Sequence, residues 1–212
     1  YAWILHMLSH LKPADGVAGF LLANGALNDS DTLEIRKKLI KNDKVEAIIV
    51  LPRELFITTD ISVTLWILNQ NKKGGNYHDR KLRSREHEIL FMDLRQWIEN
   101  PVKGESKKKV RLVTEQIEKA AAIYHTWQSE GTDGVNYEIP ELYRSVGIGE
   151  IESKGWALTP SKYIEFIDHD LDIDYEKEMA RIQSEMKDIL KQEKKSQQML
   201  EDAFRGIGYG ID

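Results

Sequence analysis

Short apolar runs, separated by polar and turn-forming residues, dominate the first half of the chain. Val17–Ala23 follows a Pro-Ala-Asp-Gly turn and precedes another polar segment. A run of this kind is typical of a strand that is buried on both faces of a parallel sheet. Three further runs predict strands, and the middle one is rich in β-branched and aromatic residues: Val45–Leu51, Ile61–Leu68 and Ile89–Leu94.

Helical patterns lie before, between and after these strands. Ala2–Leu11 predicts a buried helix that ends before Pro13. Residues 31–42 predict a second helix, because N-cap residues precede it and lysines fill its last turn. Thr114 is expected to cap a helix that runs to about Gln128, and a long helix of mixed charge is expected from Asp174 to about Arg205.

The remaining segments lack a clear period. Residues 69–85 are polar and basic and predict a loop, residues 101–109 a charged linker, and residues 135–167 irregular structure. Helices and strands alternate at first, which favours an α/β sheet. The strands are too few for a complete doubly wound domain. Four aromatic residues are expected in the core: Trp3, Phe20, Trp66 and Phe91.

Composition narrows the classes of function. The 212 residues carry a net charge of -5, so contact with DNA requires local basic patches or a partner. The absence of cysteine excludes a disulfide scaffold, a zinc ribbon and a thiol nucleophile, and it is consistent with a reducing cytoplasm. Apolar runs are too short to span a membrane, which takes about 20 residues. Because an apolar helix pattern begins at Ala2, we expect a piece of a longer chain.

Four stretches resemble one family in the same order. They are LKPADGVAGFLLANGA at 11–26, IRKKLIKNDKVEAIIVLPRELF at 35–56 with ISVTLWIL at 61–68, TEQIEKAAAIYHTW at 114–127, and GWALTPSKY at 155–163. Together they resemble the latter half of the modification subunit of type I restriction–modification systems, which are N6-adenine DNA methyltransferases. One departure is Ser62, where the family commonly has proline.

The resemblance implies a fold. It implies the C-terminal half of a Rossmann-like, S-adenosylmethionine-dependent methyltransferase sheet with one antiparallel strand, followed by a helical C-terminal region. Ile61–Leu68 is expected between Val17–Ala23 and Val45–Leu51, antiparallel to both. The spacing agrees independently, because about nine residues are too few for a parallel crossover.

The resemblance also implies an activity, although this sequence lacks two motifs that the family uses for it. The family transfers a methyl group from S-adenosylmethionine to adenine N6. Its glycine-rich cofactor turn and its Asn-Pro-Pro-aromatic catalytic motif are absent from this sequence. We therefore expect no catalytic, cofactor-binding or metal-binding residues in this chain, and neither activity nor cofactor binding by the chain alone. Residues 1–100 are expected to belong to the catalytic domain, 101–170 to a helical and irregular extension, and 171–212 to a helix and tail for subunit contact.

Candidate binding residues fall in three places. Asn24 lies just past the carboxyl end of a predicted strand, where ligands bind in open α/β sheets, and it is a candidate for the target-base side. Six basic residues in the 69–85 loop are candidates for DNA phosphates, although a solvated loop is the plainer interpretation: Lys72, Lys73, Arg80, Lys81, Arg83 and Arg85.

The last helix has apolar residues that step by four and three, which is the spacing of a coiled-coil seam. Packing on the chain's own domain and docking with another subunit are equally open. The seam continues weakly through Glu193 and Ser196 to Leu200. Its first five residues are the candidates for subunit contact: Tyr175, Met179, Ile182, Met186 and Ile189.

Other patterns have plainer explanations. His6 and His10 have the spacing of two zinc ligands but no third ligand nearby, and the alternating aspartates at 168–174 lack the glycine and glutamate of a calcium loop. The glycines at 206–210 follow a helix, whereas a phosphate loop precedes one.

The implied partners are the specificity subunit, a second modification subunit, the restriction subunit and double-stranded DNA, without a membrane. Two rival functions remain: a non-catalytic assembly module that docks a partner subunit through its C-terminal helix, and part of another α/β enzyme.

Overall fold

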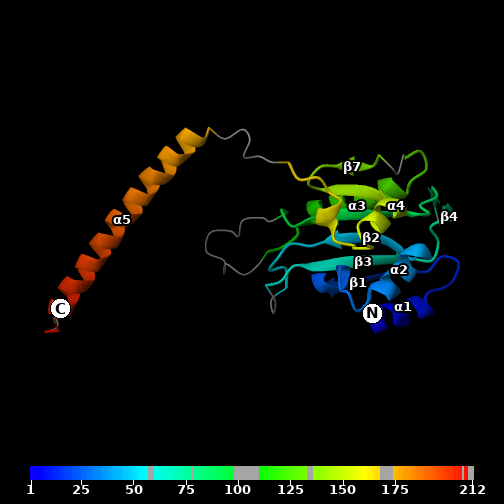
Figure 1. Ribbon diagram of the computed structural model, residues 1–212, viewed down its shortest axis with the longest axis horizontal. Coiled ribbons are helices and arrows are strands. Elements are labelled where there is room, and N and C mark those ends of the chain that lie inside the picture. Colours follow the sequence, from blue (N-terminus) through cyan, green and yellow to red (C-terminus); the bar gives the residue numbers. More distant parts are fainter. Residues whose placement is uncertain are drawn as a thin grey trace. The chain divides into compact units, whose positions relative to one another are not determined.

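The computed structural model describes residues 1–56, 60–77, 79–97, 110–132, 136–167, 174–206 and 208–209. The chain divides into two compact units, Tyr1–Ile167 and Asp168–Asp212 (Figure 1). The predicted linker at 101–109 and the aspartates at 168, 170 and 172 lie outside the described residues. The first unit contains a mixed α/β sheet, and the second contains one long helix.

Six strands form one sheet in the first unit, in the order β1-β3-β2-β6-β8-β7. Their bounds are β1 Val17–Ala23, β2 Val45–Val50, β3 Val63–Asn69, β6 Glu88–Asp93, β7 Glu138–Ile139 and β8 Tyr143–Gly147. A separate hairpin joins β4 Gly75–Tyr77 to β5 Arg80–Leu82. The strands at 17–23, 45–51, 61–68 and 89–94 predicted from sequence are confirmed, with ends that differ by at most two residues.

Strand β3 is reversed between two strands that run parallel to each other. It pairs antiparallel with β1 on one side, where Phe20 faces Trp66, and antiparallel with β2 on the other, where Ile48 faces Trp66. Strand β6 then continues parallel to β2. The predicted placement of the antiparallel strand is therefore confirmed, and the carboxyl ends of β1, β2 and β6 meet at one edge of the sheet.

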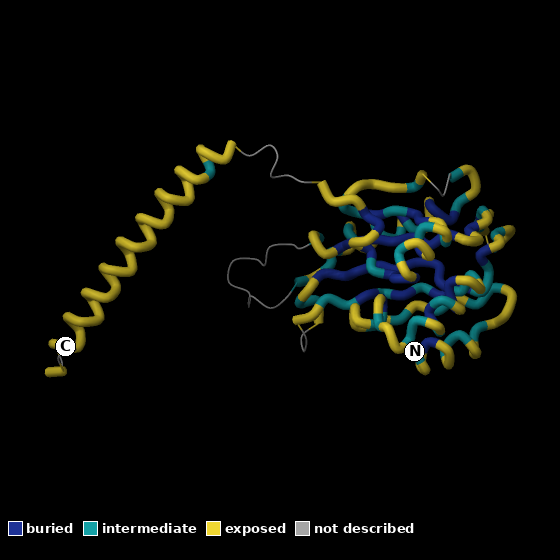
Figure 2. The backbone as a smooth tube through the Cα atoms, viewed as in Figure 1, coloured by how far each residue is buried: buried dark blue, intermediate teal, exposed yellow. Residues whose placement is uncertain are grey.

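Helices cover both faces of the sheet (Figure 2). One apolar cluster joins the sheet to α1, α2 and α4 through Ile4, Ile40 and Ile151. The other joins the opposite face to α3 through Ile123 and Trp127. The helices are α1 Ala2–His10, α2 Leu33–Lys41, α3 Thr114–Gln128 and α4 Ile148–Ser153, with short 3-10 turns η1 Asn24–Leu27 and η2 Pro160–Lys162.

The aromatic core is partly as predicted. Trp66 and Phe91 are fully buried, and Phe20 is half-buried and stacks on Trp66. Trp3 was expected in the core, but 76% of its surface is exposed. Helix α1 as a whole was expected to be buried, and only Ile4 is. The reason is that α1 contacts the rest of the unit along a single face.

Strand β1 corrects a second expectation. It was expected to be buried on both faces, yet its residues alternate between exposed and half-buried, and Val17 and Leu21 are 45% and 44% exposed. Among the described strands β1 pairs only with β3, so it is an edge strand. Among the described helices, none packs over the β1 face that carries Val17 and Leu21, because α3 packs mainly over β2, β6 and β8.

Two segments that were expected to lack regular structure contain elements. The 69–85 segment includes the β4–β5 hairpin, and the 135–167 segment includes β7, β8, α4 and η2. Both were missed because their strands are short and polar. Helix α3 begins at Thr114, and its N-cap is Val113 rather than the predicted Thr114. The Gln116 side chain accepts a hydrogen bond from the Val113 amide.

The second unit holds α5, Tyr175–Gly206, close to the predicted bounds. None of its residues is buried. In the described part of the chain, no helix is both long and apolar enough to cross a membrane.

Candidate functional site

The turn that follows β1 places Asn24 at the edge where the parallel strands end. Asn24 is the first residue of η1, and its Oδ1 accepts a hydrogen bond of 2.6 Å from the Thr64 hydroxyl. Thr64 is fully buried on β3, opposite Leu22 of β1. The bond fixes the amide oxygen toward the sheet, so the Asn24 NH₂ group remains to donate outward.

An open hollow of about 630 Å³ lies beside this turn. Tyr1 forms one wall, and its hydroxyl donates to the Ala26 carbonyl at 2.6 Å. Burial raises the pKa of the Tyr1 hydroxyl, so this group stays a neutral donor. Seven residues line it: Tyr1, Asn24, Gly25, Ala26, Asn28, Asp29 and Thr32.

A buried arginine braces the far side of the same turn. Arg36 of α2 donates from Nη1 to the Asp29 carbonyl at 2.9 Å and from Nε to the Trp156 carbonyl at 2.8 Å. Trp156 has a positive φ of 59°, and its backbone is held in that turn by the bond from its amide to the Ile151 carbonyl. The 155–163 stretch of the family resemblance thus packs behind the Asn24 turn.

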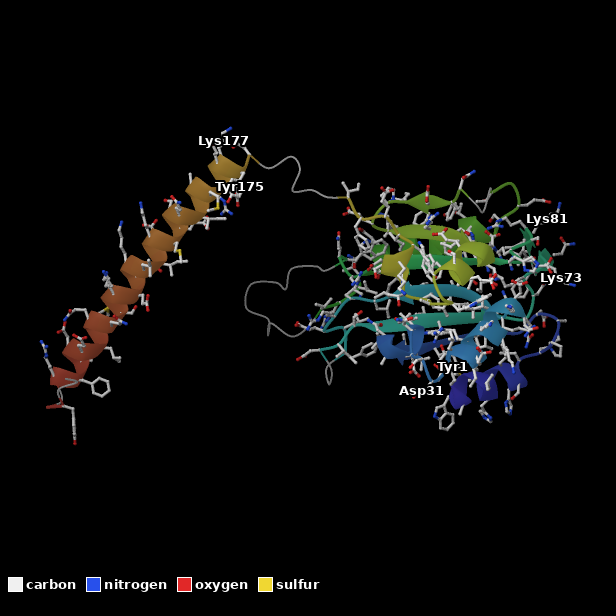
Figure 3. All side chains as sticks on the ribbon, viewed as in Figure 1. Tyr1, Asp31, Lys73, Lys81, Tyr175 and Lys177 are labelled. Atoms are coloured by element: carbon white, nitrogen blue, oxygen red, sulfur yellow. The ribbon has the colours of Figure 1, made fainter. Side chains whose placement is uncertain are left out.

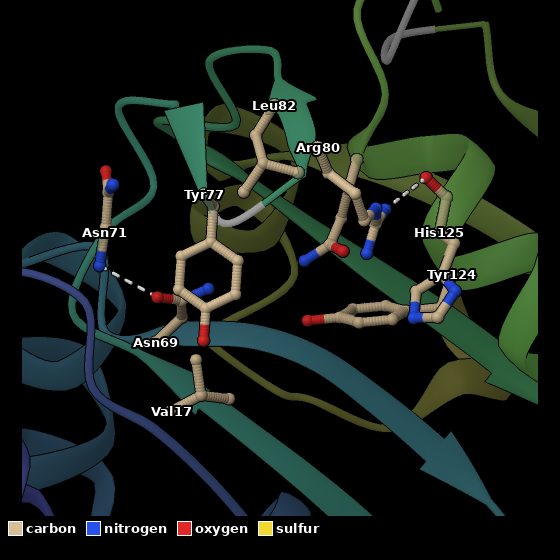
Figure 4. Close-up of a pocket in the computed structure, with 9 residues that line it drawn as sticks. Val17, Asn69, Asn71, Tyr77, Arg80, Leu82, Tyr124 and His125 are labelled. Carbon is tan, nitrogen blue, oxygen red and sulfur yellow. Dashed lines mark hydrogen bonds between the residues drawn. The ribbon is translucent and has the colours of Figure 1, made fainter. Parts of the chain in front are cut away.

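The basic segment at 69–85 lies at the opposite edge of the sheet. Val17 begins β1 and pairs with Asn69 at the end of β3, and both line a pocket of about 190 Å³ beneath the β4–β5 hairpin (Figure 4). Tyr77 and Arg80 of the hairpin and Tyr124 of α3 also line it. Because Val17 and Asn24 bracket β1, the structure does not bring this segment together with Asn24.

Three of the six phosphate candidates are held by internal partners. Arg85 is fully buried and donates to Glu46 at 2.9 Å, and Lys72 is buried and donates to the Val45 and Glu88 carbonyls. Burial lowers the pKa of Lys72, while Asp43 opposes the shift. Arg83 pairs with Glu88 and stacks over Trp127. The acids that hold these three side chains come from outside the 69–85 segment: Glu46 of β2, Glu88 of β6 and Asp43 of the turn before β2.

The other three candidates are more accessible. Lys73 and Lys81 are exposed and lie at one end of the first unit (Figure 3). Lys81 forms a surface ion pair with Glu130 at 2.7 Å, and Arg80 donates to the His125 carbonyl at 3.0 Å. Phosphate contact stays a prediction for these residues.

The acid at the centre of the buried network is Glu46. Its Oε1 accepts hydrogen bonds from Arg85, Tyr124 and Gln128, which joins β2, the 69–85 segment and α3. Burial raises the pKa of the Tyr124 hydroxyl, and the charge of Glu46 adds to this shift. The network is a structural clamp at the edge away from Asn24.

The apolar seam residues of α5 are exposed to solvent. Met186 and Ile189 are 61% and 63% exposed, and Tyr175, Met179 and Ile182 are exposed as well. His10 Nδ1 lies 2.8 Å from the His6 carbonyl. No cluster of three metal-ligating side chains occurs among the described residues, which leave out Asp168, Asp170 and Asp172.

Sequence reasoning missed Arg36 and Glu46, although each leaves a signal. Arg36 interrupts the apolar face of its helix, between Leu33 and Ile40, and Glu46 interrupts an otherwise apolar strand. A charge at a core position predicts a buried partner. The sequence does not reveal which partner, because Trp156 and Arg85 are distant in the chain.

Both the sequence and the fold of this chain are similar to those of known proteins. The model of the N-6 DNA Methylase family matches residues 1–171. The chain belongs to this family. Relatives of this chain include the type I restriction enzyme HindI methylase subunit of Haemophilus influenzae, at 31% identity over 99% of this chain and 44% of the relative. The MjaIX methylase subunit of Methanocaldococcus jannaschii is 32% identical over 99% of this chain and 35% of that protein.

The chain therefore spans less than half the length of these curated relatives. Its fold is similar to that of a solved type I restriction-modification methyltransferase subunit from Streptococcus thermophilus, with a TM-score of 0.62 and 22% identity over 77% of this chain and 30% of that one. A structure described as the basis of complex assembly of the type I system gives a TM-score of 0.56 at 18% identity, over 95% of this chain and 39% of that one. The expected family and the expected fold are confirmed.

Proposed function

We propose that this chain is part of a type I modification subunit that transfers a methyl group from S-adenosylmethionine to adenine N6 of DNA in the cytoplasm. The observation that carries the proposal is the reversed strand β3 between β1 and β2, in a chain that the N-6 DNA Methylase model matches over residues 1–171. The type I methylase relatives favour the same activity.

Asn24 is the residue of this chain that we assign to the target-base side. Its NH₂ group lies at the carboxyl edge of the parallel strands, beside an open hollow. A base that is taken out of the duplex is held by hydrogen bonds to its edge. Thr64 orients the amide, and Tyr1 and Arg36 hold the turn that carries it.

We propose that S-adenosylmethionine is held outside this chain, because the turn after β1 does not fit it. A cofactor turn needs glycines between a strand and the N-terminus of a helix, and β1 is instead followed by the Asn-Gly-Ala-Leu turn η1. We assign cofactor binding and the reacting residues to the remaining length of the protein. This chain supplies the reversed strand, the Asn24 turn and α5.

The proposed partners follow from the same assignment. They are the specificity subunit, a second modification subunit, the restriction subunit and double-stranded DNA. Lys73, Arg80 and Lys81 are the residues that we propose for phosphate contact. Because they lie at the edge opposite to Asn24, they would contact duplex away from the target base.

Methylation by the full-length subunit tests the role of Asn24. With the specificity subunit present, Asn24→Ala should lower the single-turnover rate of methyl transfer about 10-fold or more, which is the loss of roughly one hydrogen bond to the base. DNA affinity should change less than 3-fold. Asn28→Ala, which lines the same hollow without the Thr64 bond, is the matched control. Equal rates for the Asn24 variant and wild type would remove Asn24 from the site.

A second candidate function is assembly through α5, and the exposed seam favours it. A helix of 32 residues that buries none of its apolar side chains needs a partner for that face. The structure described as the basis of complex assembly shares the fold of this chain. Deletion of residues 172–212 should abolish capture of the specificity subunit while the melting temperature of the remaining subunit is kept. Unchanged capture would exclude α5 as the docking element.

A further inference from the structure

Helix α5 carries its charges in a pattern that restricts which helix can cover it. In heptad notation, Met179 and Met186 occupy the first core position, a, and Ile182 and Ile189 occupy the second, d. The next a and d positions are Glu193 and Ser196, after which Leu200 resumes the apolar seam. The seam is therefore interrupted by a carboxylate that a partner helix would cover.

The positions beside the first half of the seam carry three acids, and those beside Glu193 are neutral or apolar. Glu176, Glu178 and Glu185 occupy flanking positions e and g, and the sequence places no Lys or Arg at any e or g position of 175–206. Arg181 forms ion pairs with both Glu178 and Glu185 within the helix. Arg181, Glu178 and Glu185 together therefore keep one net negative charge. The lysines of α5 instead lie on the back of the helix, away from the seam.

A second copy of this chain is a poor occupant of the seam. In a parallel pair Glu193 would face Glu193, and two carboxylates in an apolar seam repel each other. In an antiparallel pair Glu193 would face apolar or neutral residues, because no a or d position of α5 is basic. A carboxylate that loses water without gaining a cation is costly.

We propose that α5 docks a helix of a different protein, with an apolar seam, basic flanking residues and one Lys or Arg in the seam opposite Glu193. This inference rests on the proposed docking role of α5 and adds the chemistry of the partner. The Glu193 pair sets the register, since a polar core residue is satisfied in only one alignment of two helices. Partners without the cation leave Glu193 unpaired and are rejected.

Two synthetic helices test the charge rule on the full 212-residue chain. Both carry a leucine seam and lysine flanks; one has a single lysine at the central seam position, and the other has a glutamate there. The lysine probe should bind at least 10-fold more tightly by calorimetry. Glu193→Lys should reverse the preference. High salt should weaken the binding of both probes, because it screens the flanking charges that both carry. Lys191→Glu, on the back of the helix, is the matched control and should leave the preference unchanged.

Three results would overturn the inference: equal binding of both probes, no binding of either, or a stable dimer of the chain in sedimentation that persists in Glu193→Lys and in Leu21→Glu but is lost when residues 172–212 are deleted. The experiments distinguish a failure of this inference from a failure of the docking role of α5. If deletion of residues 172–212 abolishes capture of the specificity subunit but the probes bind equally, docking stands and the charge rule is wrong. If the deletion has no effect, docking itself is wrong.

Discussion

Contacts of single residues decide which basic side chains of the 69–85 segment are buried. Its composition predicted a solvent-exposed loop for phosphates, but burial is set by partners that the local sequence does not contain. Arg85 meets Glu46 from β2, and Lys72 meets Asp43 from the turn before it. Lys73 and Lys81 have no such buried acid and stay at the surface. The Asn24 position, by contrast, could be predicted, because the end of a strand is visible in the local pattern.

Removal of Arg85 should be far more damaging than removal of its exposed neighbour. Arg85→Met leaves the buried Glu46 carboxylate without its cation, which should cost about 3–5 kcal/mol of unfolding free energy. Lys81→Met removes only a surface pair and should cost less than about 1 kcal/mol. Urea unfolding measures both. Similar losses for the two variants would mean that the Glu46–Arg85 pair is not buried.

Glu150 should give the first unit part of its sensitivity to acid. Partial burial raises the pKa of its carboxyl, but hydrogen bonds from Lys154 and Arg144 outweigh burial and hold the pKa below its usual value. A depressed folded pKa contributes stability above the unfolded value, and this contribution is lost as the pH falls through the folded pKa. Glu150→Gln should therefore lose less melting temperature than wild type between pH 6 and pH 3. An identical loss would contradict the assignment.

At the scale of elements, the reversed strand was predictable and the exposed face of β1 was not. The short connection from β2 to β3 excludes a parallel crossover whatever else the sheet contains. Whether β1 is buried depends on what pairs beside it, and its own residues are apolar in either case. The β8 strand was missed for a different reason: its Tyr-Arg-Ser-Val-Gly sequence is short and polar, and only pairing with β6 makes it a strand.

The register of β3 predicts that substitutions at two neighbouring residues lower the unfolding free energy by different amounts. Trp66 is fully buried against α1 and α2, so Trp66→Ala should cost about 3–5 kcal/mol. Leu65 points to the other, partly covered face, so Leu65→Ala should cost about 1 kcal/mol. Chemical denaturation measures both values. A larger loss at Leu65 would show that β3 is shifted by one residue.

At the scale of the whole molecule, the first unit presents an uncovered apolar strip. Val17 and Leu21 of β1 are exposed, and an apolar groove of about 250 Å³ opens between the sheet and α3. An edge strand with an exposed apolar face favours association between chains. We propose that the remaining length of the full protein covers this strip, since the relatives are more than twice as long as this chain.

The strip predicts how the 212-residue chain behaves alone. Leu21→Glu should reduce its self-association in light scattering and change its unfolding free energy by no more than about 1 kcal/mol. Leu5→Glu on α1 is the matched control, because Leu5 is equally exposed but lies on the other side of the sheet. If both substitutions reduce association equally, the effect is one of charge rather than of the β1 strip.

Methylation of adenine in DNA is the activity that we propose for the full-length protein. Mass spectrometry of nucleosides tests it most directly, after DNA has been treated with S-adenosylmethionine and the full-length subunit assembled with its specificity subunit. We expect N6-methyladenine in the treated DNA, and much less of it with Asn24→Ala. A methylated cytosine in its place, or no methylated base from an assembled complex, would exclude an adenine methyltransferase.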